Sequence, residues 1–104
     1  MRTFKHIATL IKNKRLEHAK QYSQADLSIL LGYKNGQFIS NVERALCSIP
    51  FKLIPKLEIV LNIRSEDLKS ALVKDFEETI DMHLLNRDQS DLLSEEDNLN
   101  SPNN

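Results

Sequence analysis

Residues 22–43, YSQADLSILLGYKNGQFISNVE, are the stretch that decides the fold of this 104-residue chain. Apolar residues recur at helical spacing in both halves of the stretch. They are Leu27, Leu30 and Leu31 in the first half and Phe38, Ile39 and Val42 in the second. Between the halves lie Gly32 and Gly36, and glycine is typical of positions where a helix stops and the chain turns. The stretch therefore predicts two short helices joined by a tight turn.

The start and end of the first of these helices have their own signals. Ser23 is a good N-cap, and Asp26 puts a carboxylate at the other position of a capping box. Leu31 is the expected last residue, and Gly32 can then take the left-handed conformation. The pair Asn35-Gly36 could instead nucleate a β-hairpin. Neither flank alternates apolar and β-branched residues with polar ones, so a helical pair is favoured.

The same periodicity predicts further helices over residues 3–17, 51–61 and 65–85, with the second helix of the central pair over 37–45. Two glycines and many Leu, Ile and Lys also favour helix over sheet. Pro55 fits only the first turn of a helix, so regular helix is expected from near Lys52, or else a kink. The predicted fold is an all-α, compact five-helix domain with an extended C-terminal helix.

Charge divides the chain into two parts. Residues 1–64 hold eleven Lys or Arg and four Asp or Glu, a net charge of +7. Residues 65–104 hold three Lys or Arg and eleven Asp or Glu, a net charge of −8. The positive net charge of residues 1–64 is typical of a domain that binds a polyanion, although charged residues also occur on ordinary exposed helix faces. From Asn86 the helical pattern fails, and residues 86–104 are predicted to be a disordered acidic tail.

Several classes of protein lack support in the sequence. The single Cys47 cannot form an internal disulfide, and no apolar run approaches the roughly 18 residues of a membrane span, so a cytoplasmic location is expected. The N-terminus lacks the features of a signal peptide. The three histidines and Cys47 have no metal-ligand spacing, and there is no glycine-rich phosphate loop. We therefore expect no enzymatic activity, no metal and no cofactor.

The motifs together resemble the lambda-repressor-like family, also called XRE-type helix-turn-helix, over about residues 4–68. The residues that carry the resemblance are Ser23-Gln24, Leu27, Leu31-Gly32, Ile39, Val42-Glu43-Arg44, Leu57 and Leu61-Asn62-Ile63. The resemblance implies a DNA-binding domain over 1–68 whose second and third helices form the reading unit. Two features depart from the family: the turn is one residue longer, and Ala45 replaces the usual glycine after Glu-Arg.

Side-chain chemistry and the resemblance together suggest DNA contacts. Gln37 and Asn41 lie one turn apart on the outer face of the third helix, and their amides can bond to adenine. The resemblance implies that Gln24 binds a phosphate. The expected base-contacting residues are Gly36, Gln37, Ser40 and Asn41, where Gly36 would allow close approach to the groove. The expected backbone-contacting residues are Gln24, Lys34, Asn35, Arg44 and Lys52. The alternative is a solvated helix face.

Glu43 would repel phosphate on a DNA-facing helix. The resemblance implies that it pairs with a basic residue of the first helix. Arg15 is the best candidate, because its planar guanidinium matches a carboxylate with two bonds. Lys14 is the second candidate.

The long helix over 65–85 is the predicted dimerisation element, since one reading unit covers too few base pairs for useful specificity. Its predicted interface is Leu68, Leu72, Phe76, Ile80 and Leu84. The leading hypothesis is a homodimeric transcriptional regulator, a repressor that binds double-stranded DNA at a palindromic operator. The alternatives are an antitoxin whose acidic tail binds a toxin, and a protein-interaction adaptor that no longer binds DNA.

Overall fold

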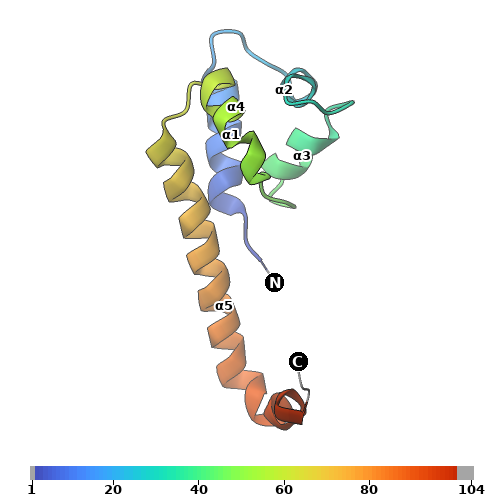
Figure 1. Ribbon diagram of the computed structural model, residues 1–104, viewed down its shortest axis with the longest axis vertical. Coiled ribbons are helices and arrows are strands. Elements are labelled where there is room, and N and C mark those ends of the chain that lie inside the picture. Colours follow the sequence, from blue (N-terminus) through green and yellow to red (C-terminus); the bar gives the residue numbers. More distant parts are fainter. Residues whose placement is uncertain (1, 101–104) are drawn as a thin grey trace.

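The fold is all-helical, as predicted (Figure 1). The computed structural model describes residues 2–100, with side chains for residues 2–85. Within that range it contains five α-helices and one short 3-10 helix, η1, and no strand. The elements are α1 (Lys5–Glu17), α2 (Gln24–Leu30), α3 (Gln37–Glu43), η1 (Phe51–Leu53), α4 (Ile54–Val60) and α5 (Ser65–Asn100). None of these helices is long and apolar enough to cross a membrane.

One apolar core joins the elements. α1 packs against α3 and α5, and α2 packs against α3. Full burial of one such aliphatic side chain stabilises the fold by roughly 1.5–3 kcal/mol. The largest fully buried apolar side chains are Ile7, Ile11, Leu27, Ile39, Val42, Leu57, Leu61 and Leu68. Of the residues that the spacing indicates in the central pair, Leu27, Leu31, Ile39 and Val42 are buried and Phe38 packs partly against the core, whereas Leu30 is 42% exposed, so its prediction is wrong.

Three helices end in the same way, with one residue in the left-handed conformation. These residues are Gly32 (φ 99°), Ala45 (φ 60°) and Asn62 (φ 55°), after α2, α3 and α4. The amide that follows each of them donates to a carbonyl of the preceding helix at 2.9–3.1 Å, which is the Schellman arrangement. The prediction for Gly32 is confirmed. Ala45 takes the same conformation, although glycine adopts it more easily.

The helix predicted over 51–61 begins differently from the prediction. Residues Phe51–Leu53 form η1, and regular α-helix begins only at Ile54 instead of near Lys52. Pro55 lies in the first turn of α4, where its missing amide has no intrahelical partner. The proline is accommodated without a break inside the helix because the preceding residues form a tighter turn.

α5 is longer than predicted. It continues to Asn100 and does not end at Leu85, so the predicted helix end is wrong. No glycine or proline occurs between Ser65 and Asn100, and nothing in that composition stops a helix before Pro102. The predicted acidic tail, 86–104, falls on residues whose side chains, and for 101–104 also the backbone, lie outside the described part of the chain.

The N-terminus of α1 is capped by α5. Phe4 is at the N-cap and provides no side-chain bond. Instead, the buried carboxylate of Asp75 accepts the amides of His6 (Oδ1, 2.8 Å) and Ile7 (Oδ2, 3.0 Å). A carboxylate at this position satisfies two orphan donors and complements the positive end of the helix dipole. The cap therefore fastens α1 to α5.

A second contact lies beside this cap. His6 Nε2 is 2.6 Å from Glu78 Oε2, and Lys5 Nζ is 3.4 Å from Glu78 Oε1. The hydrogen bond with His6 lowers the pKa of Glu78 below its ordinary value, with a further contribution from Lys5. Thr79 adds a bond on the same side, because its Oγ1 accepts the Thr3 amide at 3.0 Å.

Candidate nucleic-acid interface

The α2–α3 pair begins at a complete capping box. Ser23 Oγ accepts the Asp26 amide at 2.9 Å, and Asp26 Oδ2 accepts the Ser23 amide at 3.2 Å. This pair satisfies two amides at the start of α2 and stabilises a helix that is too short to be stable alone. The predicted roles of Ser23 and Asp26 are confirmed.

The start of α3 is held by residues outside that helix. Gly36 is its N-cap and has no side chain to bond the first amides. Asn35 Oδ1 accepts the Gln37 amide at 2.9 Å, and Ser28 Oγ accepts the Ile39 amide at 3.0 Å. Ser28 is fully buried in α2. Its hydroxyl therefore fixes where α3 begins relative to α2.

The role of Ser28 was not predicted. The available signal was its place directly beside Leu27 on the apolar side of α2, where a polar residue needs a partner.

The lengthened turn is supported by an aromatic contact, since the rings of Tyr33 and Phe38 stack at a centroid distance of 4.0 Å. After this turn, α3 begins at Gln37, with Gly36 at the N-cap position.

Gly36 lies close to the backbone of α2. A Cβ at this position would lie 3.0 Å from Ala25 Cα and 3.1 Å from Ala25 N. Its φ of −77° is open to any residue. Glycine is therefore favoured at this position because the turn passes close to the backbone of α2, and a Cβ would need a small shift of Ala25. The expected approach of Gly36 to a DNA groove stays a prediction.

α3 is held at its other end by an ion pair. Arg15 Nε lies 2.7 Å from Glu43 Oε2, and Arg15 Nη2 lies 3.0 Å from Glu43 Oε1. The side chains of Arg15 and Glu43 are only 11% and 3% exposed. These bonds raise the pKa of Arg15, while burial acts in the opposite direction. Arg15 rather than Lys14 is thus the partner of Glu43.

Gln24 extends this network. Its Nε2 donates to Glu43 Oε1 at 2.9 Å, so the first residue of α2 bonds to the last residue of α3. Arg15 also donates from Nη1 to the Tyr22 carbonyl at 3.0 Å. Glu43 is therefore bonded by α1 and α2 at once, and the orientation of α3 is set by three contacts at its C-terminal end.

The outer face of α3 carries the two predicted amides together. Gln37 Nε2 donates to Asn41 Oδ1 at 2.8 Å on the exposed side of the helix. Gln37 is exposed, whereas Asn41 and Ser40 are half-buried. The bond holds both amides side by side, which lowers the entropy cost of presenting them to a ligand.

The three cations in the predicted backbone-contacting set are exposed. They are Lys34, Arg44 and Lys52, and within residues 2–85 none of them is paired with a carboxylate. Asn35 is also exposed, but its Oδ1 caps α3 and is therefore already engaged. These cations come from three separate segments: the turn before α3, the end of α3, and η1.

The five residues predicted to form the dimer interface differ in their exposure to solvent. Leu68 is 1% exposed and belongs to the core, so its assignment to an interface is wrong. Leu72 is half-buried and packs against the core. Phe76, Ile80 and Leu84 are exposed. A period of four residues drifts around a helix by about 40° per step, which is why one sequence stripe begins in the core and ends in solvent.

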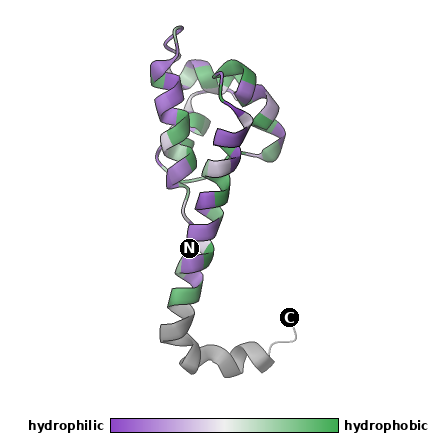
Figure 2. Ribbon diagram, turned by 90° about the vertical axis from the view of Figure 1, so that its left-hand side faces the viewer, coloured by the Kyte–Doolittle hydropathy of each residue, from purple (hydrophilic) through white to green (hydrophobic). Residues whose placement is uncertain are grey.

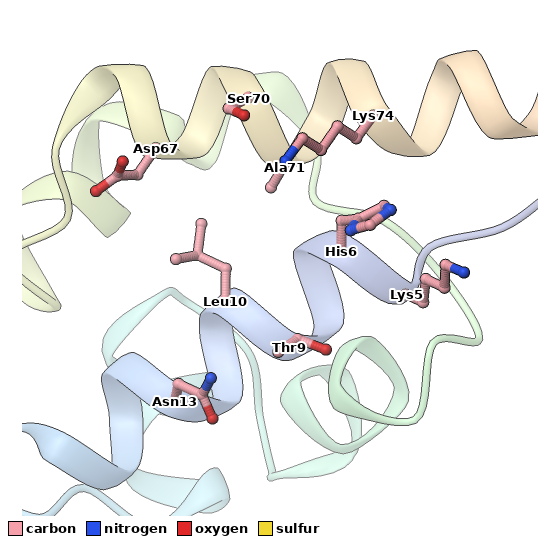
Figure 3. Close-up of a pocket in the computed structure, with 9 residues that line it drawn as sticks. All are labelled: Lys5, His6, Thr9, Leu10, Asn13, Asp67, Ser70, Ala71 and Lys74. Atoms are coloured by element: carbon pink, nitrogen blue, oxygen red, sulfur yellow. The ribbon is translucent and has the colours of Figure 1, made fainter.

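A polar groove of about 460 Å³ lies between α1 and α5 (Figure 3). Lys5, His6 and Asn13 line it from α1, and Ser70 and Lys74 line it from α5. Two of these side chains, those of Lys5 and His6, are already engaged by Glu78. Neither Gln37 nor Asn41 lines the groove, and it brings together no group of three or more possible metal ligands among the described residues.

Cys47 is half-buried, and burial raises the pKa of its thiol. A raised pKa lowers the thiolate fraction at neutral pH, and the thiolate is the nucleophile. His6, His18 and His83 make separate local contacts, with Glu78, Tyr22 and the Thr79 carbonyl. The structure does not bring the three histidines and Cys47 together.

Comparison with protein-family models gives no match, and comparisons with curated proteins and with solved structures give none either.

Proposed function

We propose that this chain is a sequence-specific DNA-binding transcriptional regulator that uses a lambda-repressor-like helix-turn-helix. It acts as a homodimeric repressor at a palindromic operator in the cytoplasm, with α3 in the major groove. The observation that carries the proposal is the bonded pair of amides, Gln37 and Asn41, on the outer face of a helix fixed at both ends.

The remaining hydrogen-bonding groups of Gln37 and Asn41 match those on the major-groove edge of adenine. The bond between Gln37 Nε2 and Asn41 Oδ1 leaves the Gln37 carbonyl oxygen and the Asn41 amino group available. Together they offer one acceptor and one donor, and adenine in the major groove presents one donor, N6, and one acceptor, N7. The two residues can therefore read one adenine as a unit, or two neighbouring bases separately. Ser40, which is half-buried and directly precedes Asn41, is a weaker candidate for a base contact.

The other predicted contact residues can bind DNA phosphates. Lys34 and Asn35 lie in the turn before α3, and Arg44 lies just after it. Lys52 lies in η1. Gln24 keeps one amino hydrogen after its bond to Glu43 and can donate it to a phosphate from the start of α2. Such contacts set the register of α3 on the duplex but carry no sequence information.

Binding-site selection from random duplex DNA tests the proposal. We expect an enriched palindrome with half-sites about one helical turn apart. With about six phosphates neutralised, log affinity against log salt should have a slope of about −5. An unenriched pool, or a slope near zero, would overturn the proposal.

A further inference from the structure

The outer face of α5 carries an apolar stripe that no other element of the described residues covers. Val73, Phe76, Ile80 and Leu84 recur at intervals of three and four residues. Their exposed fractions are 44%, 60%, 41% and 49%. By contrast, Asp75 and Thr79, on the other side of the helix, are buried and bond to the amides of α1 and of Thr3. Figure 2 shows hydrophobic segments, in green, along α5 where it extends away from the other helices. We call these four residues the α5 stripe.

Phe51 of η1 extends this surface beyond the helix. It is 77% exposed, and it lines two neighbouring hollows. The hollow of about 310 Å³ is also lined by Phe4, Val73 and Phe76, and the hollow of about 410 Å³ by Ile54 and Val73. An apolar projection thus lies directly beside apolar hollows on one surface, which is the shape that a self-complementary contact requires.

The size of this surface fits a pair of copies. With roughly 200 Å² for an aromatic side chain and roughly 100 Å² for an aliphatic one, Phe51 and the α5 stripe expose roughly 400 Å² of apolar surface. Two copies would bury roughly 800 Å² of it. Homodimer interfaces are about 65% apolar, so the whole contact reaches roughly 1,200 Å², the lower limit of the usual size.

Charges beside the stripe suggest the direction of pairing. Lys69 precedes Val73 by four residues and Glu77 follows it by four, and both are exposed. If two α5 helices crossed antiparallel at Val73, Lys69 of each copy would face Glu77 of the other. A parallel pair would instead set Lys69 against Lys69 and Glu77 against Glu77, which is unfavourable.

We propose that Phe51 and the α5 stripe bind a second copy of this chain, with the two α5 helices antiparallel near Val73 and each Phe51 inserted into an apolar hollow of the other copy. The contact is isologous and closes at two copies. It joins η1 and α5, which pack on the same core as α3, and so fixes the separation of the two α3 helices. This last consequence rests on the proposed function.

Sedimentation equilibrium of the full chain tests the contact. Phe51→Asp should yield monomers, with a circular dichroism spectrum like that of the parent because Phe51 is mostly exposed. Ile59→Asp is the matched control, since Ile59 of α4 is 82% exposed and lies outside the stripe and both hollows. It should leave the dimer intact. A monomeric parent, or a Phe51→Asp variant that dimerises like the parent, would overturn the proposal.

A charge exchange tests the antiparallel direction. Lys69→Glu should weaken dimerisation about tenfold, because two attractive pairs become repulsive. The double variant Lys69→Glu, Glu77→Lys should restore it. If the double variant is weaker than the single one, the direction is wrong.

DNA binding separates this proposal from the proposed function. Phe51→Asp should lose the palindrome preference but keep salt-dependent binding to one half-site. A dimer that depends on Phe51 but binds no DNA would leave the contact standing and overturn the regulator.

Discussion

Arg15 and Glu43 form a two-bond ion pair that joins the last turn of α1 to the end of α3, with N–O distances of 2.7 and 3.0 Å. Both side chains are largely withdrawn from water. Bonds from Tyr22 and Gln24 occupy further donors and acceptors of the pair, so little hydrogen-bonding capacity is lost by burial. The pair also keeps a carboxylate of α3 away from the outer face.

Glu43→Ala should destabilise the fold by about 3–5 kcal/mol, since it leaves the Arg15 guanidinium buried without its partner. Urea denaturation measures the loss as a change in the free energy of unfolding. Arg15→Lys keeps the charge but cannot form the planar two-bond contact, so it should lie between the parent and Glu43→Ala. Equal unfolding free energies for Glu43→Ala and the parent would show that the pair contributes nothing to stability.

Acid should weaken the attachment of α5 to α1 through Glu78. Because the bond with His6 lowers the pKa of Glu78 from an ordinary value of 4.5, the folded state holds the proton less tightly than the unfolded state. The stabilisation is therefore present above about pH 4.5 and is lost as the pH falls through the lowered pKa. Unfolding free energies of Glu78→Gln, measured across this range, should show a shallower acid dependence than those of the parent.

Glu17→Gln, which removes another exposed carboxylate, is the control for this experiment. It should keep the acid dependence of the parent. If Glu78→Gln and the parent lose stability in parallel, the contact between His6 and Glu78 has no part in acid unfolding.

Ala45→Gly should stabilise the protein, although most substitutions in a folded chain destabilise it. Ala45 has a φ of 60°, which an L-residue with a side chain adopts at a cost, and glycine adopts freely. After the greater entropy of glycine in the unfolded chain is subtracted, the gain should be about 0.5–1 kcal/mol. Thermal unfolding of the variant should show a higher midpoint.

Gly32→Ala is the reciprocal change at the end of α2. A Cβ there would meet no atom within 4 Å, so its cost is conformational alone. It should lower the unfolding free energy by about 1 kcal/mol. A stabilised Gly32→Ala, or a destabilised Ala45→Gly, would contradict the conformational explanation of both helix ends.

The predictable parts of the fold were those whose partners are near in sequence. Ser23 and Asp26 are three residues apart, and Gly32 acts on the helix that it follows, so their local patterns carried the information. The pair of Arg15 and Glu43 spans 28 positions. It could be predicted because a carboxylate on a DNA-facing helix needs a cation as partner, and the family resemblance implied that this cation lies on the first helix.

The unpredictable parts depend on how helices meet. Asp75 caps α1 from 69 positions away, and its spacing on α5 resembles that of any solvated carboxylate. Ser28 is bonded because α3 begins beside it, which only the packed pair reveals. Leu68 shares a sequence period with Phe76 but faces the core, because the period of four and the helical turn of 3.6 residues diverge along α5.

The amide pair on α3 gives the sharpest test of DNA reading. Gln37→Ala and Asn41→Ala should each weaken binding to the selected operator by about 1–3 kcal/mol, and less for DNA of other sequence. Because the two side chains bond to each other, the double variant should lose less than the sum of the single losses.

Lys34→Ala is the matched control for these variants. It should weaken binding to every sequence alike and reduce the salt slope by about one, since Lys34 is exposed in the turn and is proposed to contact a phosphate. Titrations with the operator and with a scrambled duplex distinguish the two patterns. If Asn41→Ala weakens both duplexes equally, as Lys34→Ala should, the amides of α3 contact phosphates and the sequence is read elsewhere.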